Sequence, residues 1–347
     1  MMRTTQASVA LGFLILLFAS FGAQEEDAFP KITPEFMDKI NDPDSDWPRD
    51  PAVPDLPPLP DTDQAGLNPD AFLTSHYNNG VNPPKVAGPP APLTAVVNEE
   101  NPLKADVFWS MRSPYSYLAL ERLVWLNSNY NVDINIRVVM PIAVRSTKGG
   151  KGKAGGMFGI TYKVPDLFWD TVRQGQFLEV PFKYPVPDPI WQNTYPPFEE
   201  GWLSVHPPGK QPYIHWLVRL ACYAEQQGKA LDYVNQVSSL IYGGHEEHWP
   251  AHVKERFNRI EGLDYDKAIK YIQKNPEKVD SCWLGNSEGM AKAGHGGVPL
   301  MVFQGEPFFG GDRFDSFVWR LNQSGLTRRQ ETRPPFTAKP AHWPAGM

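Results

Sequence analysis

The chain is poor in cysteine: only Cys222 and Cys282, among 347 residues, carry a thiol. Two cysteines cannot form a disulfide framework or supply a cysteine-rich zinc module. Neither lies in a Cys-x-x-Cys pair, so neither has the sequence context of a redox nucleophile. A disulfide between them and two buried free thiols are both open alternatives.

Basic residues are too few for a typical nucleic-acid-binding protein. Lysine and arginine number 33 against 39 acidic residues, which gives a net charge of −6 and a pI near 5.8. Because nucleic-acid binders present a basic surface, we expect no nucleic-acid partner. A homodimer remains open on this evidence.

Long hydrophobic runs are missing as well. The apolar run at residues 11–18 follows Arg3 and is too short to span a bilayer. With Ser20, Gly22 and Ala23 behind it, the pattern predicts a signal peptide over residues 1–23. We therefore expect an exported protein, periplasmic or secreted, and an uncleaved membrane anchor is the alternative.

Proline is abundant, with 36 residues. Residues 24–103 are rich in proline and show little hydrophobic periodicity. Such a segment buries too little apolar surface to offset its ordering entropy alone. We expect a proline-rich N-terminal extension that lies on the domain or links to it, and a C-terminal tail over 326–347 that is disordered or draped.

The folded part is organised around residues 106–123, where a short strand, 107–109, runs through a polar turn into a helix over 116–127. The turn reads Ser113-Pro114-Tyr115-Ser116. Proline suits the first helical position, and a helix N-terminus stabilises a nearby anion such as a thiolate. A plain N-cap role for Ser113 or Ser116 is the alternative.

Downstream periodicity completes a compact domain over residues 104–325. Residues 132–140 alternate as a second strand, which makes a βαβ unit. Helical spacing recurs at 213–223, 231–242, 251–260, 265–273 and 279–293, so we expect a helical insertion over about 160–293. Short strands at 300–303 and 307–309 precede a final helix, for which Asp312 and Asp315 resemble a capping pair.

A second motif, Gly296-Gly297-Val298-Pro299, lies between that insertion and the final strands. Together with the Ser113–Ser116 turn, it resembles the DsbA-like branch of the thioredoxin superfamily. The likeness is greatest to the 2-hydroxychromene-2-carboxylate isomerases and the kappa-class glutathione transferases, whose turn reads Ser-Pro-Tyr-Ser and whose cis-proline loop reads Gly-Val-Pro. This resemblance implies an α/β, thioredoxin-like fold with an inserted all-helical subdomain.

The resemblance also implies glutathione as a thiol cosubstrate and a hydrophobic or aromatic small molecule as the second substrate. Ser113 would stabilise the glutathione thiolate. Glutathione would contact Pro114, Val298, Pro299, Gly311 and Asp312. The second substrate would contact Tyr115, Ser116, Lys151, Lys153 and Tyr162.

Two features of the sequence bear on the contacts expected with the second substrate. The basic, glycine-rich stretch at 145–156, which contains Lys151 and Lys153, could attract an anionic substrate or be a solvated loop. The arginine that the family carries three residues after Asp166 is Trp169 here.

Serine at both turn positions excludes disulfide oxidoreductase chemistry there, because only a thiolate can attack a disulfide. The resemblance implies an isomerase or a transferase, and a thioredoxin-like binding module without catalysis is the alternative. We expect no metal, because His245 and His248 lack the His-Glu-x-x-His spacing.

Overall fold

The computed structural model describes residues 51–57, 96–141, 144, 164–190, 192–193, 204–205, 211–244, 248–335 and 337–344. The predicted signal peptide lies outside these residues, as do Lys151, Lys153 and Tyr162. Within the described part, no helix combines the length and apolar character needed to cross a bilayer.

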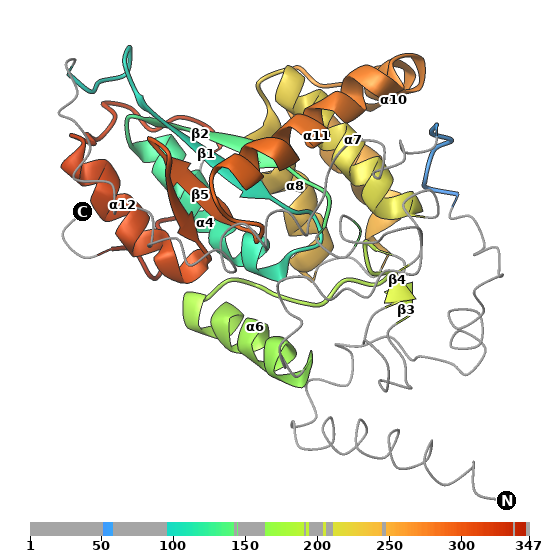
Figure 1. Cartoon of the computed structure of the whole chain (residues 1–347), viewed down its shortest axis with the longest axis horizontal. Coiled ribbons are helices and arrows are strands. Elements are labelled where there is room, and N and C mark those ends of the chain that lie inside the picture. Colours follow the sequence, from blue (N-terminus) through green and yellow to red (C-terminus); the bar gives the residue numbers. More distant parts are fainter. Residues whose placement is uncertain are drawn as a thin grey trace, which may run out of the picture. The chain divides into compact units, whose positions relative to one another are not determined.

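A four-stranded sheet in the order β2-β1-β5-β6 forms the centre (Figure 1). Strand β1 (Leu103–Trp109) pairs in parallel with β2 (Val132–Val138), and β5 (Leu300–Phe303) runs antiparallel to β1 and to β6 (Glu306–Phe309). Burial alternates strictly along β2, whereas the last three residues of β1 are all buried because β1 lies inside the sheet. The predicted βαβ unit and final strand pair are confirmed.

Helix α4 (Pro114–Asn129) connects β1 to β2. It begins at a proline whose missing N–H costs nothing at this position. Leu123, Val124 and Leu126 are fully buried, which fixes the helix against the core. The helix starts two residues before the predicted 116 and ends two residues after 127, so the turn at Ser113 leads directly into it.

The described residues between β2 and β5 are mainly helical, as predicted. They contain α6 (Val164–Leu178), α7 (Pro212–Gln226), α8 (Ala230–Tyr242), the 3-10 helix η2 (Trp249–His252), α9 (Val253–Asn258), α10 (Tyr265–Lys274) and α11 (Pro276–Lys292). One addition is a short antiparallel pair, β3 (Gln192–Asn193) with β4 (Ser204–Val205). Two-residue strands are too short to show a period of two, so the sequence did not predict this pair.

The chain after β6 forms the 3-10 helix η3 (Gly311–Arg313) and then α12 (Phe314–Gln323). The predicted capping role of Asp312 and Asp315 is wrong, since neither helix start has a side-chain cap. The reason is that Asp312 lies inside η3 rather than before α12. Its carboxylate instead pairs with Arg313, 3.0 Å away.

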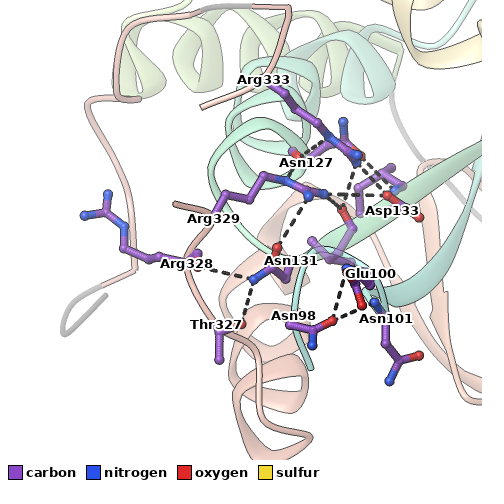
Figure 2. Close-up of polar contacts among 12 residues, drawn as sticks. Asn98, Glu100, Asn101, Asn127, Asn131, Asp133, Thr327, Arg328, Arg329 and Arg333 are labelled. Atoms are coloured by element: carbon purple, nitrogen blue, oxygen red, sulfur yellow. Dashed lines mark hydrogen bonds and ion pairs between the residues drawn. The ribbon is translucent and has the colours of Figure 1, made fainter. Parts of the chain in front are cut away.

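Residues 326–335 and 337–344 drape over α4 and the start of β2. Figure 2 shows Arg329 and Arg333 reaching the end of α4 and Asp133, and Arg333 Nη2 lies 2.6 Å from Asp133 Oδ1. The backbone N–H of Asn131 donates to Thr327 C=O at 2.8 Å. This segment is therefore draped, which was one of the two predicted alternatives.

Candidate functional site

The turn at Ser113 and the loop before β5 lie at the same end of the sheet, where β1 ends and β5 begins. Phe108 pairs with Leu300 in antiparallel register, so Pro299 lies at the same edge as the end of β1. The Gly310 N–H donates to the Pro299 C=O at 2.9 Å, which brings the start of η3 to this edge too. Three segments that the sequence singled out thus converge.

Ser113 is the N-cap of α4. Its backbone N–H donates to Ser110 C=O at 3.0 Å, and its Oγ accepts the Ser116 N–H at 3.2 Å. The cap reading is therefore confirmed for Ser113, but it uses only the acceptor side of the hydroxyl. Among the described residues none accepts a hydrogen bond from this half-buried hydroxyl. Ser113 can therefore cap the helix and still donate to a bound anion.

Ser116 behaves differently from its sequence neighbour. Its side chain is 0% exposed, and its Oγ has no hydrogen-bond partner among the described residues. This burial places the Ser116 hydroxyl away from the surface at the helix mouth, and the predicted substrate contact stays a prediction. The capping role considered for Ser116 is wrong, because Ser113 fills it.

Tyr115 is half-buried beside Pro114, and its hydroxyl donates to Asp170 Oδ2 on α6 at 2.6 Å. Asp170 lies 3.7 Å from Arg173 on the same helix. The bond from Tyr115 ties α6 to the start of α4. A substrate contact by Tyr115 would therefore involve its ring, because the hydroxyl is committed to Asp170.

Arg112, directly before Ser113, was not assigned a role from the sequence. Its Nε and Nη2 donate to the two carboxylate oxygens of Asp188 at 3.3 and 3.0 Å. Asp188 also accepts the Ile190 N–H at 2.9 Å. This two-bond ion pair fixes the turn against a loop 76 residues away, a separation that leaves no local signal in the sequence.

The loop before β5 contains a cis peptide bond between Val298 and Pro299. Pro299 is buried, while Val298 packs against a small apolar cluster made of Phe108, Val139, Met290 and Leu300. None of the described residues hydrogen-bonds to the backbone N–H or C=O of Val298. Both groups are therefore available to an extended peptide ligand.

His295 supports this loop and was not predicted as a site residue. Its ring stacks on Phe309 with 3.9 Å between centroids, and its Nδ1 accepts the Gly297 N–H at 2.9 Å. Burial lowers the pKa of His295, so the ring is neutral at neutral pH and carries its hydrogen on Nε2. The sequence signal that could have identified His295 was its position two residues before Gly297, directly before the Gly-Gly-Val-Pro motif.

Gly311 and Asp312 complete the edge. The Gly311 C=O accepts a hydrogen bond from Arg122 Nη2 at 3.0 Å, and a Cβ on Gly311 would lie 3.3 Å from the same nitrogen. This close approach favours glycine. The Asp312 side chain is 69% exposed, so its carboxylate is accessible to a ligand at this edge.

Two other kinds of site lie apart from these residues or are missing from the described chain. A pocket of about 480 Å³ lies between β2 and the start of α8, but none of the predicted site residues lines it. In the part of the chain that the structure describes, no group of three or more acidic, histidine or cysteine side chains could hold a metal ion. His245 lies outside that part.

A βαβ unit followed by an antiparallel strand pair and a helix, with a cis-proline loop beside the first helix, defines the thioredoxin class of folds. The chain belongs to the DSBA-like thioredoxin domain family, whose family model matches residues 104–322. The predicted fold class is therefore confirmed.

Two solved structures resemble the chain. A selenomethionine structure of 2-hydroxychromene-2-carboxylate isomerase is 19% identical, covers 64% of this chain and 95% of its own, and gives a TM-score of 0.42. A probable DsbA oxidoreductase from Streptomyces coelicolor is 13% identical, covers 64% and 89%, and gives a TM-score of 0.44. No curated protein matches the sequence.

Proposed function

We propose that this protein is a glutathione-dependent isomerase or transferase in which Ser113 donates a hydrogen bond to the glutathione thiolate. The observation that carries the proposal is the uncommitted hydroxyl hydrogen of Ser113 at the N-terminus of a 16-residue helix. The first turn of α4 holds no acidic side chain, so nothing there offsets the positive end of the helix dipole. Such a site favours a thiolate over a thiol.

The neighbouring loops offer partners for the rest of glutathione. The free N–H and C=O of Val298 would pair with the tripeptide backbone as an added strand. The exposed carboxylate of Asp312 would receive the amino group of the γ-glutamyl moiety. Pro114, Pro299 and Gly311 would shape the floor of this site.

The proposed chemistry uses the thiolate of bound glutathione, because the turn at Ser113 contains no cysteine of its own. The thiolate adds to a conjugated aromatic substrate and converts a double bond into a single bond about which the substrate rotates. Departure of the thiolate then completes an isomerisation with no net redox change. In a transferase the new carbon–sulfur bond is kept instead. The half-exposed ring of Tyr115 would contact this second substrate, together with Lys151, Lys153 and Tyr162.

Export forms a separate part of the proposal. The predicted signal peptide would be removed after residue 22 or 23, which leaves the mature chain to act in the periplasm or outside the cell. N-terminal sequencing of the mature protein tests this directly. A mature chain that retains residues 11–18 would favour the membrane-anchored alternative.

Calorimetric titration with reduced glutathione tests the main proposal, and S-methylglutathione is the matched ligand that cannot form a thiolate. We expect glutathione to bind roughly 10-fold tighter or more, since a hydrogen bond to a charged group contributes about 1.5–3 kcal/mol. Equal affinity for the two ligands would contradict a role for the thiolate. Binding of neither ligand would leave a thioredoxin-like binding module without glutathione chemistry.

A further inference from the structure

Helices α7 and α11 lie side by side (Figure 1). Two cross-links between them show the register. Arg219 contacts Asp280, and Glu225 contacts Asn286, and each pair is separated by 61 residues in the sequence. A constant separation means that the two helices pair in parallel over this length.

The first cross-link is a buried ion pair. Arg219 Nε donates to Asp280 Oδ1 at 2.8 Å, and the two side chains are only 0% and 4% exposed. Trp283 Nε1 donates to the same oxygen at 3.0 Å. A buried pair with this geometry holds the two helices in one register, because a shift would leave a buried charge without its partner.

The second cross-link is centred on the Glu225 carboxylate. Its Oε2 accepts the Asn286 Nδ2 hydrogen at 2.8 Å and the Cys282 thiol at 3.4 Å, while Oε1 accepts from Arg137 at 2.6 Å. Cys222 lies three residues before Glu225, and Cys282 lies four residues before Asn286. Residues three or four apart share one face of a helix, so both cysteines are on the faces that meet.

The two thiols lie between these cross-links. Cys222 is fully buried, whereas Cys282 is partly exposed. Burial and then the neighbouring Cys282 thiol raise the pKa of Cys222, as expected for two side chains on helix faces that meet. Both thiols are free in the structure. A dissolved reagent therefore reaches Cys282 first, because Cys222 is fully buried on the facing side of α7.

We propose that Cys222 and Cys282 are a redox-active pair that closes into a disulfide between α7 and α11 by exchange with a small-molecule disulfide. The Cys282 thiolate attacks the reagent, forms a mixed disulfide and releases one reagent thiolate, which takes up the Cys282 proton. Cys222 then attacks the Cys282 sulfur and releases the second reagent thiol, which takes up the Cys222 proton. The two protein thiols lose two electrons, and the reagent disulfide gains them.

The surroundings set the order and speed of these steps. Burial raises the pKa of the Cys222 thiol, so the closing step is slower than an exposed thiol would allow. The carboxylate of Glu225 accepts the Cys282 S–H and orients that sulfur. The sequence left a disulfide between these residues open, because they are 60 positions apart rather than in a Cys-x-x-Cys motif.

The test treats the full-length protein with hydroxyethyl disulfide under native conditions and follows intact mass and thiol content. The chain has only two cysteines, so the thiol count is unambiguous. We expect both thiols to be lost, a mass lower by two hydrogen atoms with no reagent retained, and full reversal by dithiothreitol. The oxidised protein should melt roughly 5–15 °C higher, because the bond closes a long loop.

Two variants assign the roles. Cys222→Ala should hold the reagent on Cys282 as a stable mixed disulfide, whereas Cys282→Ala should leave Cys222 unmodified. Cys222→Ser replaces the first variant if alanine impairs folding. Wild-type protein that keeps two free thiols, or that keeps the reagent on Cys282 without closing, overturns the proposal. Because this reagent contains no glutathione, the result is independent of the function proposed for Ser113.

Discussion

Ser113 has two roles that different substitutions separate. Its Oγ caps α4 by accepting the Ser116 N–H at 3.2 Å, and its hydroxyl hydrogen is proposed to bind the thiolate. Ser113→Ala removes both roles and should lower the free energy of unfolding by about 1 kcal/mol. Ser113→Gly removes the hydroxyl as well, but glycine is a good N-cap residue and should cost only a few tenths of that.

Thiol addition should respond equally to both substitutions. Loss of one hydrogen bond to a developing or full negative charge slows the reaction by roughly 10- to 1,000-fold. The assay is the initial rate of glutathione addition to a chromogenic electrophile, measured beside urea unfolding of each variant. Ser116→Ala is the matched control, because that hydroxyl is fully buried, caps nothing and should leave the rate unchanged.

The two readouts decide between the roles of Ser113. If the rate follows stability, so that Ser113→Gly keeps the wild-type rate and only Ser113→Ala loses it, then the hydroxyl acts as a cap alone. That result would refute the proposed hydrogen bond to the thiolate.

Three further predictions concern stability. Asp280→Asn should destabilise the fold by about 3–5 kcal/mol in urea unfolding, because it leaves Arg219 charged and buried without its partner, and the exposed control Asp266→Asn should change stability by less than about 1 kcal/mol. Burial lowers the pKa of His215 from 6.5 to about 3, so the unfolded chain takes up a proton that the folded chain refuses, and stability should fall as pH drops from 6.5 toward 3. His215→Leu should flatten this part of the profile by up to roughly 5 kcal/mol, and an unchanged slope would contradict the assignment. Trp343→Ala should cost roughly 1–3 kcal/mol, since the ring packs against three aromatic neighbours, and an unchanged melting temperature would show that the draped tail contributes nothing.

Much of the fold could be predicted because its signals are local. Apolar residues at helical spacing located α7, α8, α10 and α11 to within a few residues. The first strand was predicted too short, at 107–109, since its earlier half includes the exposed Lys104, which breaks the apolar run. The draped tail depends on contacts between distant residues, such as that of Arg333 with Asp133, and no local pattern encodes these.

The residues of the candidate site also fall into two groups, those with a local sequence signal and those placed by contacts between distant residues. Short motifs located Ser113 and the Val298–Pro299 loop, because a proline at a helix start and a proline before a strand have direct backbone meanings. The ion pair of Arg112 with Asp188 joins residues 76 positions apart and left no such mark. The two serines of this turn look alike in sequence, and only the fold decides that Ser113 caps the helix while Ser116 is buried.

The proposed function requires that α4 holds glutathione as a thiolate at Ser113. The most direct measurement is the pKa of the bound glutathione thiol, followed through the ultraviolet absorbance of the thiolate as the complex is titrated with base. We expect a pKa at least about one unit below the ordinary thiol value of about 8.5. A bound thiol that titrates at or above that value would contradict it.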